Sequence, residues 1–188
     1  MTNATWPEPA LGRLDASWRG DYIDRATADE RMLVATGNEP TTGESCVFCA
    51  MFEQASSTDS EDAQVVIRGR TANVVLNRYP YSSGHLLVLP ARHVADLESL
   101  SAPERSELFE LVSRASAALR RAYLPDGMNV GINIGRAGGA GLPGHLHAHV
   151  VPRWSGDTNF MTVIGEARVV PEALGVSLLR VRAAWDEL

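Results

Sequence analysis

Short apolar runs in the middle of the chain predict β-strands. They occupy residues 65–67, 73–76 and 85–90 and are rich in valine and leucine, as buried strands are. Residues 128–134 add a strand in which apolar residues alternate with small or polar ones. Strict alternation returns at residues 145–149, His-Leu-His-Ala-His. This pattern places the three imidazoles on one face of a strand and the apolar side chains on the other.

Two segments have the spacing of amphipathic helices. Ser101 and Glu104 form a capping-box pattern with Pro103 in the first turn, and the helix should extend to about Tyr123. Its apolar face should be buried and consists of Leu108, Leu111, Val112, Ala115 and Leu119. A second helix should begin near Pro171, and its apolar residues are Leu178, Leu179, Val181 and Trp185. An antiparallel sheet with one long helix and a C-terminal helix is an α+β fold.

The patterned segments also suggest how the chain is divided. Residues 1–45 are weakly patterned and punctuated by proline and glycine, so we expect an N-terminal extension that packs on the core. Residues 46–165 hold the predicted strands and the long helix, and residues 166–188 hold the C-terminal helix. With 188 residues, the chain is long enough for one domain with a substantial core.

Composition narrows the range of functions. The net charge is −6, and the sequence contains no lysine. We therefore expect no basic surface for nucleic acid or an anionic membrane, and chemistry that needs a lysine Schiff base or a P-loop lysine is excluded. No apolar run approaches the roughly 20 residues of a membrane span. The N-terminus lacks the apolar core of a signal peptide, so we expect a cytoplasmic protein.

Cys46 and Cys49, the two cysteines of the sequence, are separated by two residues. This gap lets both sulfurs bind one tetrahedral metal ion. A thioredoxin-like redox pair has the same gap, although no βαβ pattern surrounds the motif here. A metal ion would need two more ligands, for which His93 and His145 are the obvious donors. Alternatively, the three alternating histidines could share a zinc ion.

The loop before the histidine strand is rich in glycine. Residues 135–144 read Gly-Arg-Ala-Gly-Gly-Ala-Gly-Leu-Pro-Gly. Such a loop can present successive backbone N–H groups to phosphate oxygens without obstruction by side chains. Directly before three histidines, it indicates a phosphate-binding site.

These motifs together resemble the histidine triad (HIT) superfamily. The pattern His-apolar-His-apolar-His-apolar-apolar at residues 145–151 resembles its signature, and Asn77-Arg78 followed by residues 83–90 resembles its upstream half-site. The glycine-rich stretch also matches, so the resemblance extends over residues 46 to about 165. Residues 152–160 resemble bacterial members that are likened to diadenosine tetraphosphate phosphorylases.

The resemblance implies an enzyme that transfers a nucleotidyl group in two steps. His147, the central histidine, would attack the α-phosphorus of a nucleotide, and water or phosphate would then release the nucleotide from the imidazole. His149 would hydrogen-bond phosphate oxygens. The other implied substrate contacts are Asn77 for the ribose, Asn133 for a phosphate, and the backbone amides of Gly139, Ala140, Gly141 and Leu142 for the transition-state charge.

The zinc-bearing relatives within this family imply a metal site. Its ligands would be Cys46, Cys49, His93 and His145. Two sulfurs and two nitrogens make a closed, structural Zn²⁺ site, which would hold the strand of His147 in place. With His145 committed to this site, an all-histidine zinc site is excluded. His85 then has a packing or hydrogen-bonding role beside the pocket, and the resemblance also implies a homodimer.

The predicted function is cleavage of dinucleoside polyphosphates, such as diadenosine tetraphosphate, through a covalent nucleotidyl-histidine. Inorganic phosphate would be the second substrate of a phosphorylase, and water that of a hydrolase. Many HIT hydrolases have Gln and then Ser or Thr before the triad, whereas residues 141–144 here read Gly-Leu-Pro-Gly. The missing hydroxyl disfavours nucleoside phosphoramidate hydrolysis. That activity, a nucleotide-binding module with negligible turnover, and a DNA-repair deadenylase, which the net charge of −6 disfavours, are the alternatives.

Overall fold

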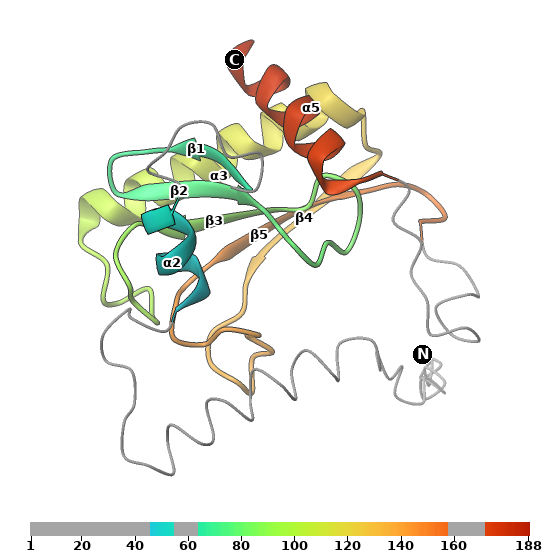
Figure 1. Ribbon diagram of the computed structural model, residues 1–188. Coiled ribbons are helices and arrows are strands. Elements are labelled where there is room, and N and C mark those ends of the chain that lie inside the picture. Colours follow the sequence, from blue (N-terminus) through green and yellow to red (C-terminus); the bar gives the residue numbers. More distant parts are fainter. Residues whose placement is uncertain (1–45, 55–63, 158–171) are drawn as a thin grey trace, which may run out of the picture.

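The computed structural model describes residues 46–54, 64–157 and 172–188, which form one sheet and the helices around it (Figure 1). The strands are β1 (Val65–Arg68), β2 (Ala72–Leu76), β3 (Leu86–Pro90), β4 (Gly127–Ile132) and β5 (Ala148–Arg153). The helices are α2 (Val47–Gln54), α3 (Ala102–Tyr123) and α5 (Leu174–Asp186). The predicted α+β fold is therefore confirmed. The expected N-terminal extension, residues 1–45, lies outside the described residues.

The strands pair in the order β1-β2-β3-β5-β4, and every neighbouring pair is antiparallel. β5 therefore lies between β3 and β4. In this register His149 is opposite Leu87 of β3 and Gly131 of β4. Gly131 has no side chain, so the sheet surface beside His149 is open on the β4 side.

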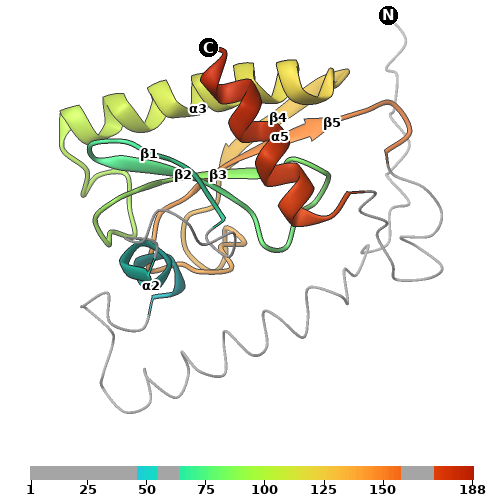
Figure 2. The same cartoon turned by 45° about the horizontal axis from the view of Figure 1, so that its top comes forward.

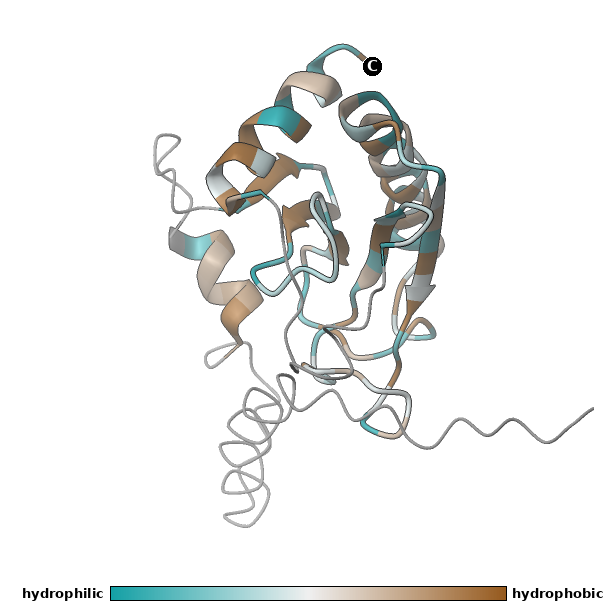
Figure 3. Cartoon of the chain, turned by 90° about the vertical axis from the view of Figure 1, so that its right-hand side faces the viewer, coloured by the Kyte–Doolittle hydropathy of each residue, from teal (hydrophilic) through white to brown (hydrophobic). Residues whose placement is uncertain are grey.

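The two faces of the sheet are covered differently. In Figure 2, α3 lies along one face and α2 lies on the opposite side. α5 packs against α3 and reaches β1 and β2. The main core lies under α3 and α5, where Leu108, Leu119 and Val181 are completely buried, and the helix sides that face the strands are the apolar ones in Figure 3. A smaller cluster around Phe48 lies under α2.

The long helix begins as its sequence predicts. The Ser101 hydroxyl accepts a hydrogen bond from the Glu104 backbone N–H, and the Glu104 carboxylate accepts one from the Ser101 N–H. The helix ends at Tyr123, and the residue after it, Leu124, has a left-handed backbone with φ of 47°. All five residues of the predicted stripe are buried. This reciprocal capping fixes where α3 starts relative to β3.

The histidine strand differs from the prediction at its start. β5 begins at Ala148, so His145 and His147 lie in the extended segment that leads into the ladder. The alternation still holds, because Leu146, Ala148 and Val150 are buried in the main core. The imidazoles do not form an exposed face, however, since His145 and His147 are 1% and 5% exposed. The reason is that α2, which the sequence pattern did not predict, covers this side of the sheet.

The C-terminal helix begins at Leu174, three residues later than predicted. Leu178, Val181 and Trp185 are buried as expected, but Leu179 is 63% exposed because it lies on the outer side of the helix. Among the helices of the described residues, none is long and apolar enough to cross a membrane.

Candidate active site and metal centre

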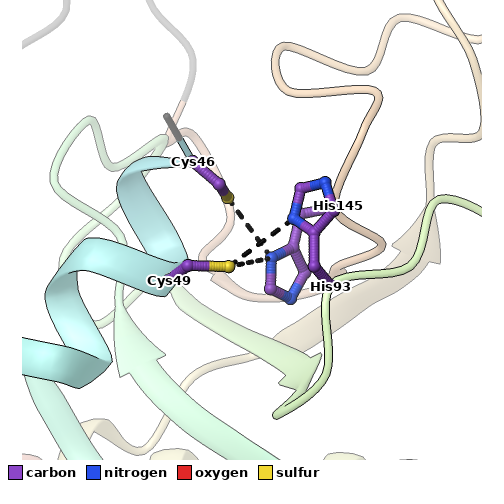
Figure 4. Close-up of side chains that lie close together, drawn as sticks. All are labelled: Cys46, Cys49, His93 and His145. Atoms are coloured by element: carbon purple, nitrogen blue, oxygen red, sulfur yellow. Dashed lines mark hydrogen bonds between the residues drawn. The ribbon is translucent and has the colours of Figure 1, made fainter. Parts of the chain in front are cut away.

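Two cysteines and two histidines meet at the N-terminal end of α2. The ligand atoms of Cys46, Cys49, His93 and His145 all lie within 4.8 Å of one another, and Figure 4 shows their side chains converging on one point. The His145 Nδ1 atom is 3.3 Å from the Cys46 Sγ and 3.7 Å from the Cys49 Sγ. The His93 Nδ1 atom is 3.5 Å from the Cys49 Sγ.

The surroundings of these side chains suit a metal ion. The His145 Nε2–H donates to the Pro90 carbonyl at 2.9 Å, which leaves the Nδ1 lone pair directed at the sulfurs. Burial lowers the pKa of His145 to about 4, so the ring is neutral, as a ligand must be. Burial and the neighbouring Cys46 raise the pKa of the Cys49 thiol to about 11, and a bound cation would counter this by stabilising the thiolate. Two thiolates and two neutral imidazoles fit Zn²⁺.

The central histidine presents a nitrogen lone pair. The Nδ1 atom of His147 is 2.8 Å from the His145 backbone carbonyl, which can only accept, so Nδ1 carries the proton. The Nε2 atom of the neutral ring therefore has a free electron pair. Burial lowers the pKa of His147, which favours this neutral form. The Phe48 ring packs against the His147 ring, with 5.5 Å between their centroids.

The third histidine, His149, has the opposite tautomer, because it accepts a hydrogen bond from His85. The backbone N–H of Tyr81 donates to the His85 Nδ1 at 3.1 Å, so the neutral His85 ring carries its proton on Nε2. That Nε2 is 3.0 Å from the His149 Nδ1 and donates to it. His149 accepts on Nδ1 and so carries its own proton on Nε2. The His147 ring, with its lone pair, and the His149 ring, with its N–H, are thus neighbours, with centroids 5.1 Å apart.

The structure brings the predicted asparagines to this region in different ways. The Asn133 amide nitrogen is 3.4 Å from the Gly139 carbonyl and joins the end of β4 to the glycine-rich loop. The Asn77 side chain is held by its own loop: its oxygen accepts from the Tyr79 N–H, and its nitrogen is 3.2 Å from the His85 Nδ1. The predicted role of Asn77 at the ribose stays a prediction.

Two of the four predicted amide donors already have partners. The Gly139 N–H donates to the Arg136 carbonyl at 2.9 Å, and the Ala140 N–H donates to the Gly135 carbonyl at 3.2 Å. These bonds form the turn of the glycine-rich loop. Gly141 and Leu142 follow this turn, and the phosphate contacts predicted for all four amides stay predictions.

A cavity of about 700 Å³ opens beside His149. Its wall includes His149 and Asn133, as predicted for the substrate site, but not Asn77 or the loop residues 139–142. It also includes residues that sequence reasoning missed, namely Tyr81, Tyr123, Glu172 and Arg180. Tyr81 stacks on the His149 ring with an interplanar angle of 15°. No local spacing could reveal these four, because they come from three separate segments of the chain.

The family profile described as the HIT domain matches residues 58–156, more than half of the chain. This chain belongs to the HIT family. A relative from Mycobacterium tuberculosis described as AP-4-A phosphorylase is 44% identical to this HIT protein over 123 residues, which are 65% of this chain and 63% of the relative. The asymmetrical bis(5′-nucleosyl)-tetraphosphatase of Schizosaccharomyces pombe is 32% identical over 95 residues, 50% of this chain and 52% of the relative.

Solved structures resemble this HIT protein over a larger share of their length. A zinc-bound histidine triad family protein from Mycobacterium smegmatis has a TM-score of 0.62 and 27% identity, covering 78% of this chain and 96% of its own. A hypothetical histidine triad nucleotide-binding protein from Sulfolobus tokodaii has a TM-score of 0.62 and 26% identity, covering 76% and 93%. The chain spans less than two thirds of the length of each of the two curated relatives described above.

Proposed function

We propose that this HIT protein cleaves dinucleoside polyphosphates through a covalent nucleotidyl-histidine at His147. The observation that carries the proposal is the pair of opposite tautomers in neighbouring rings: His147 has an acceptor nitrogen and His149 a donor nitrogen. A nucleophile needs a lone pair and phosphate oxygens need a donor, so the two rings suit the two halves of the reaction. The AP-4-A phosphorylase of M. tuberculosis, 44% identical, supports the substrate class.

Cleavage of diadenosine tetraphosphate takes two steps. The His147 Nε2 lone pair forms a bond to one α-phosphorus, and the bond from this phosphorus to the bridging oxygen breaks. ATP leaves, with the electron pair on that oxygen, where the His149 N–H stabilises the charge. An oxygen of inorganic phosphate, or of water, then attacks the phosphorus and the P–N bond breaks. ADP forms with phosphate and AMP forms with water, and the lone pair returns to His147.

A product assay with and without phosphate tests this proposal. The protein should convert diadenosine tetraphosphate to ATP and ADP with phosphate, or to ATP and AMP without it. The His147→Ala variant should lose at least about 10³-fold in rate, the scale of removing a covalent nucleophile. A circular dichroism melt like that of the wild type controls for folding. Full turnover by the variant, or no acid-labile adenylyl adduct on the wild type, would refute the mechanism.

We also propose that Cys46, Cys49, His93 and His145 hold a structural Zn²⁺. When bound, the ion would supply no chemistry to the substrate; it would fix the start of α2 against the backbone of His145. The converging donors and the zinc-bound M. smegmatis protein support this assignment. We also propose a cytoplasmic location, because cysteines that bind a metal ion rather than form a disulfide are typical of reducing compartments. We further propose a homodimer in which the sheet continues across the edge strand β4.

A further inference from the structure

The cavity beside His149 is larger than the reacting phosphate needs. Its volume of about 700 Å³ falls within the roughly 300–1,000 Å³ of pockets that hold whole small molecules. From His149 and Asn133 it extends along β4 and β5 to the start of α5. Its far wall contains Glu172 and Arg180, which lie beyond the HIT domain match at residues 58–156. This wall is therefore an addition of this chain to the matched domain.

The far wall carries an arginine that is already held in position. The Arg180 guanidinium is 3.1 Å from the Glu172 carboxylate and lies over the Tyr123 ring, 5.2 Å from its centroid. Glu172 is fixed in turn by the hydroxyls of Tyr123 and Ser177, which donate to it at 2.5 and 2.7 Å. About half of the Arg180 side chain, 49%, is exposed. An oriented guanidinium loses little freedom when it binds a phosphate, for which its planar fork is well suited.

The position of the cavity relative to His147 indicates which part of the substrate it takes. The His147 ring contacts Phe48, which belongs to the apolar cluster under α2. It also contacts the His149 ring, and the cavity begins at His149. A nucleophile and its leaving group lie on opposite sides of the phosphorus, so a donor that stabilises the leaving oxygen marks the leaving side. The cavity is on that side.

We propose that this cavity, with Arg180 as its anchoring cation, binds the leaving nucleoside polyphosphate. For diadenosine tetraphosphate the ligand is the departing ATP portion, so the assignment rests on the proposed function and extends it. Arg180 contacts phosphate oxygens of this portion, and the rings of Tyr81 beside His149 and of Tyr123 beside Arg180 add aromatic surface to the cavity. The cavity thereby selects substrates with a long, charged leaving group over those with a small one.

Substrates that differ only in the leaving group test this assignment. Cleavage of diadenosine tetraphosphate releases ATP, whereas cleavage of the 4-nitrophenyl ester of AMP releases a small phenolate. Both substrates place the same adenylyl group on His147. Arg180→Met should lower kcat/KM for diadenosine tetraphosphate about tenfold, as expected for one charge-assisted contact. It should change kcat/KM for the nitrophenyl ester less than about twofold. Arg180→Lys, which keeps the charge but not the fork, should fall between the wild type and Arg180→Met.

Arg114→Met is the matched control. Arg114 also lies over an aromatic ring, 4.9 Å from the centroid of Trp185, but it does not line the cavity. It changes the net charge equally and should leave both substrates unaffected. Equal losses on both substrates with Arg180→Met would show a merely structural role and overturn the assignment, as would no loss on either.

Direct binding separates this assignment from the proposed chemistry. ATP is titrated calorimetrically into the wild-type protein saturated with AMP, which occupies the nucleotide side. ATP should bind, and Arg180→Met should weaken it about tenfold, whereas Arg114→Met should not. If neither substrate is cleaved but this pattern holds, the proposed reaction fails and the subsite stands. Absence of ATP binding in the presence of AMP would overturn the subsite even if the reaction is confirmed.

Discussion

Backbone groups decide which nitrogen of each triad histidine carries the proton. The carbonyl of Pro90 takes the Nε2–H of His145, and the carbonyl of His145 takes the Nδ1–H of His147. The Nδ1 atom of His149 receives its hydrogen bond from a side chain, His85, which the backbone N–H of Tyr81 orients in turn. Three rings that look equivalent in the sequence thus differ in the nitrogen they present, which suits them to the three proposed roles of metal ligand, nucleophile and donor.

At this scale we predict that His85 is a positioning residue for His149. In His85→Leu, the His149 Nδ1 loses its donor, and the proton can move to that nitrogen. The rate of nucleotidyl transfer should fall by about tenfold, the scale of one hydrogen bond that orients a catalytic ring. In ¹⁵N spectra, the His149 signals should shift toward the Nδ1-protonated tautomer.

His85→Gln is the matched control, because its amide can still donate toward the His149 Nδ1. It should recover part of the rate and restore the His149 tautomer. An unchanged tautomer in His85→Leu would show that His85 merely fills space, whatever happens to the rate.

The element that most needs help to fold is α2. It has only 8 residues, and helices this short are marginal in water unless tertiary contacts hold them. Its first turn is bounded by the two cysteines, and its far end is held by the Arg68 guanidinium, which donates to the Phe52 carbonyl at 2.8 Å. Between these ends, Phe48 packs on the rings of both His145 and His147. The order of α2 therefore affects the surroundings of His147, the proposed nucleophile.

At the element scale we predict that removing the metal loosens α2 and not the sheet. The purified protein should contain about one zinc per chain, and a chelator should lower Tm by several degrees because the metal binds only the folded site. Amide hydrogen exchange should accelerate in residues 46–54 and 145–147, whereas α3 and β1–β3 stay protected. Cys49→Ser is the control: it should bind less than about half an equivalent of zinc, and the chelator should change it no further. Equal exchange with and without the chelator would contradict the metal site.

Features of the fold and the site that are encoded within a short stretch of the chain could be predicted from the sequence. Features formed by segments far apart in the chain could not. The histidine alternation, the Cys46/Cys49 gap and the capping box of α3 are local patterns, and each could be predicted. The helix α2 could not, because its contacts come from β1, β3 and the triad segment rather than from its own spacing. The wall formed by Tyr123, Glu172 and Arg180 joins the end of α3 to α5, which no pattern in either segment predicts.

At the scale of the whole molecule, the C-terminal helix α5 packs as part of the same core as the sheet and α3. It lies outside the HIT domain match, yet Leu178, Val181 and Trp185 belong to the same core cluster as α3 and the sheet. The Arg182 guanidinium donates to the Val65 carbonyl, at 2.5 Å from the nearer nitrogen, and so ties α5 to β1. A core that is continuous across these elements should unfold in one cooperative transition.

Two adjacent leucines of α5 test this continuity. Leu178 is 4% exposed and Leu179 is 63% exposed. The same substitution should therefore change the free energy of unfolding strongly at Leu178 and hardly at all at Leu179. Leu178→Ala should lower the free energy of unfolding by about 2–5 kcal/mol, the range for a cavity in a shared core. Leu179→Ala should change it by less than about 0.5 kcal/mol. Urea melts followed by tryptophan fluorescence and by far-UV circular dichroism should coincide for both variants. A Leu178→Ala protein that loses helix α5 first, while the sheet unfolds at the wild-type midpoint, would show that α5 is a separate unit.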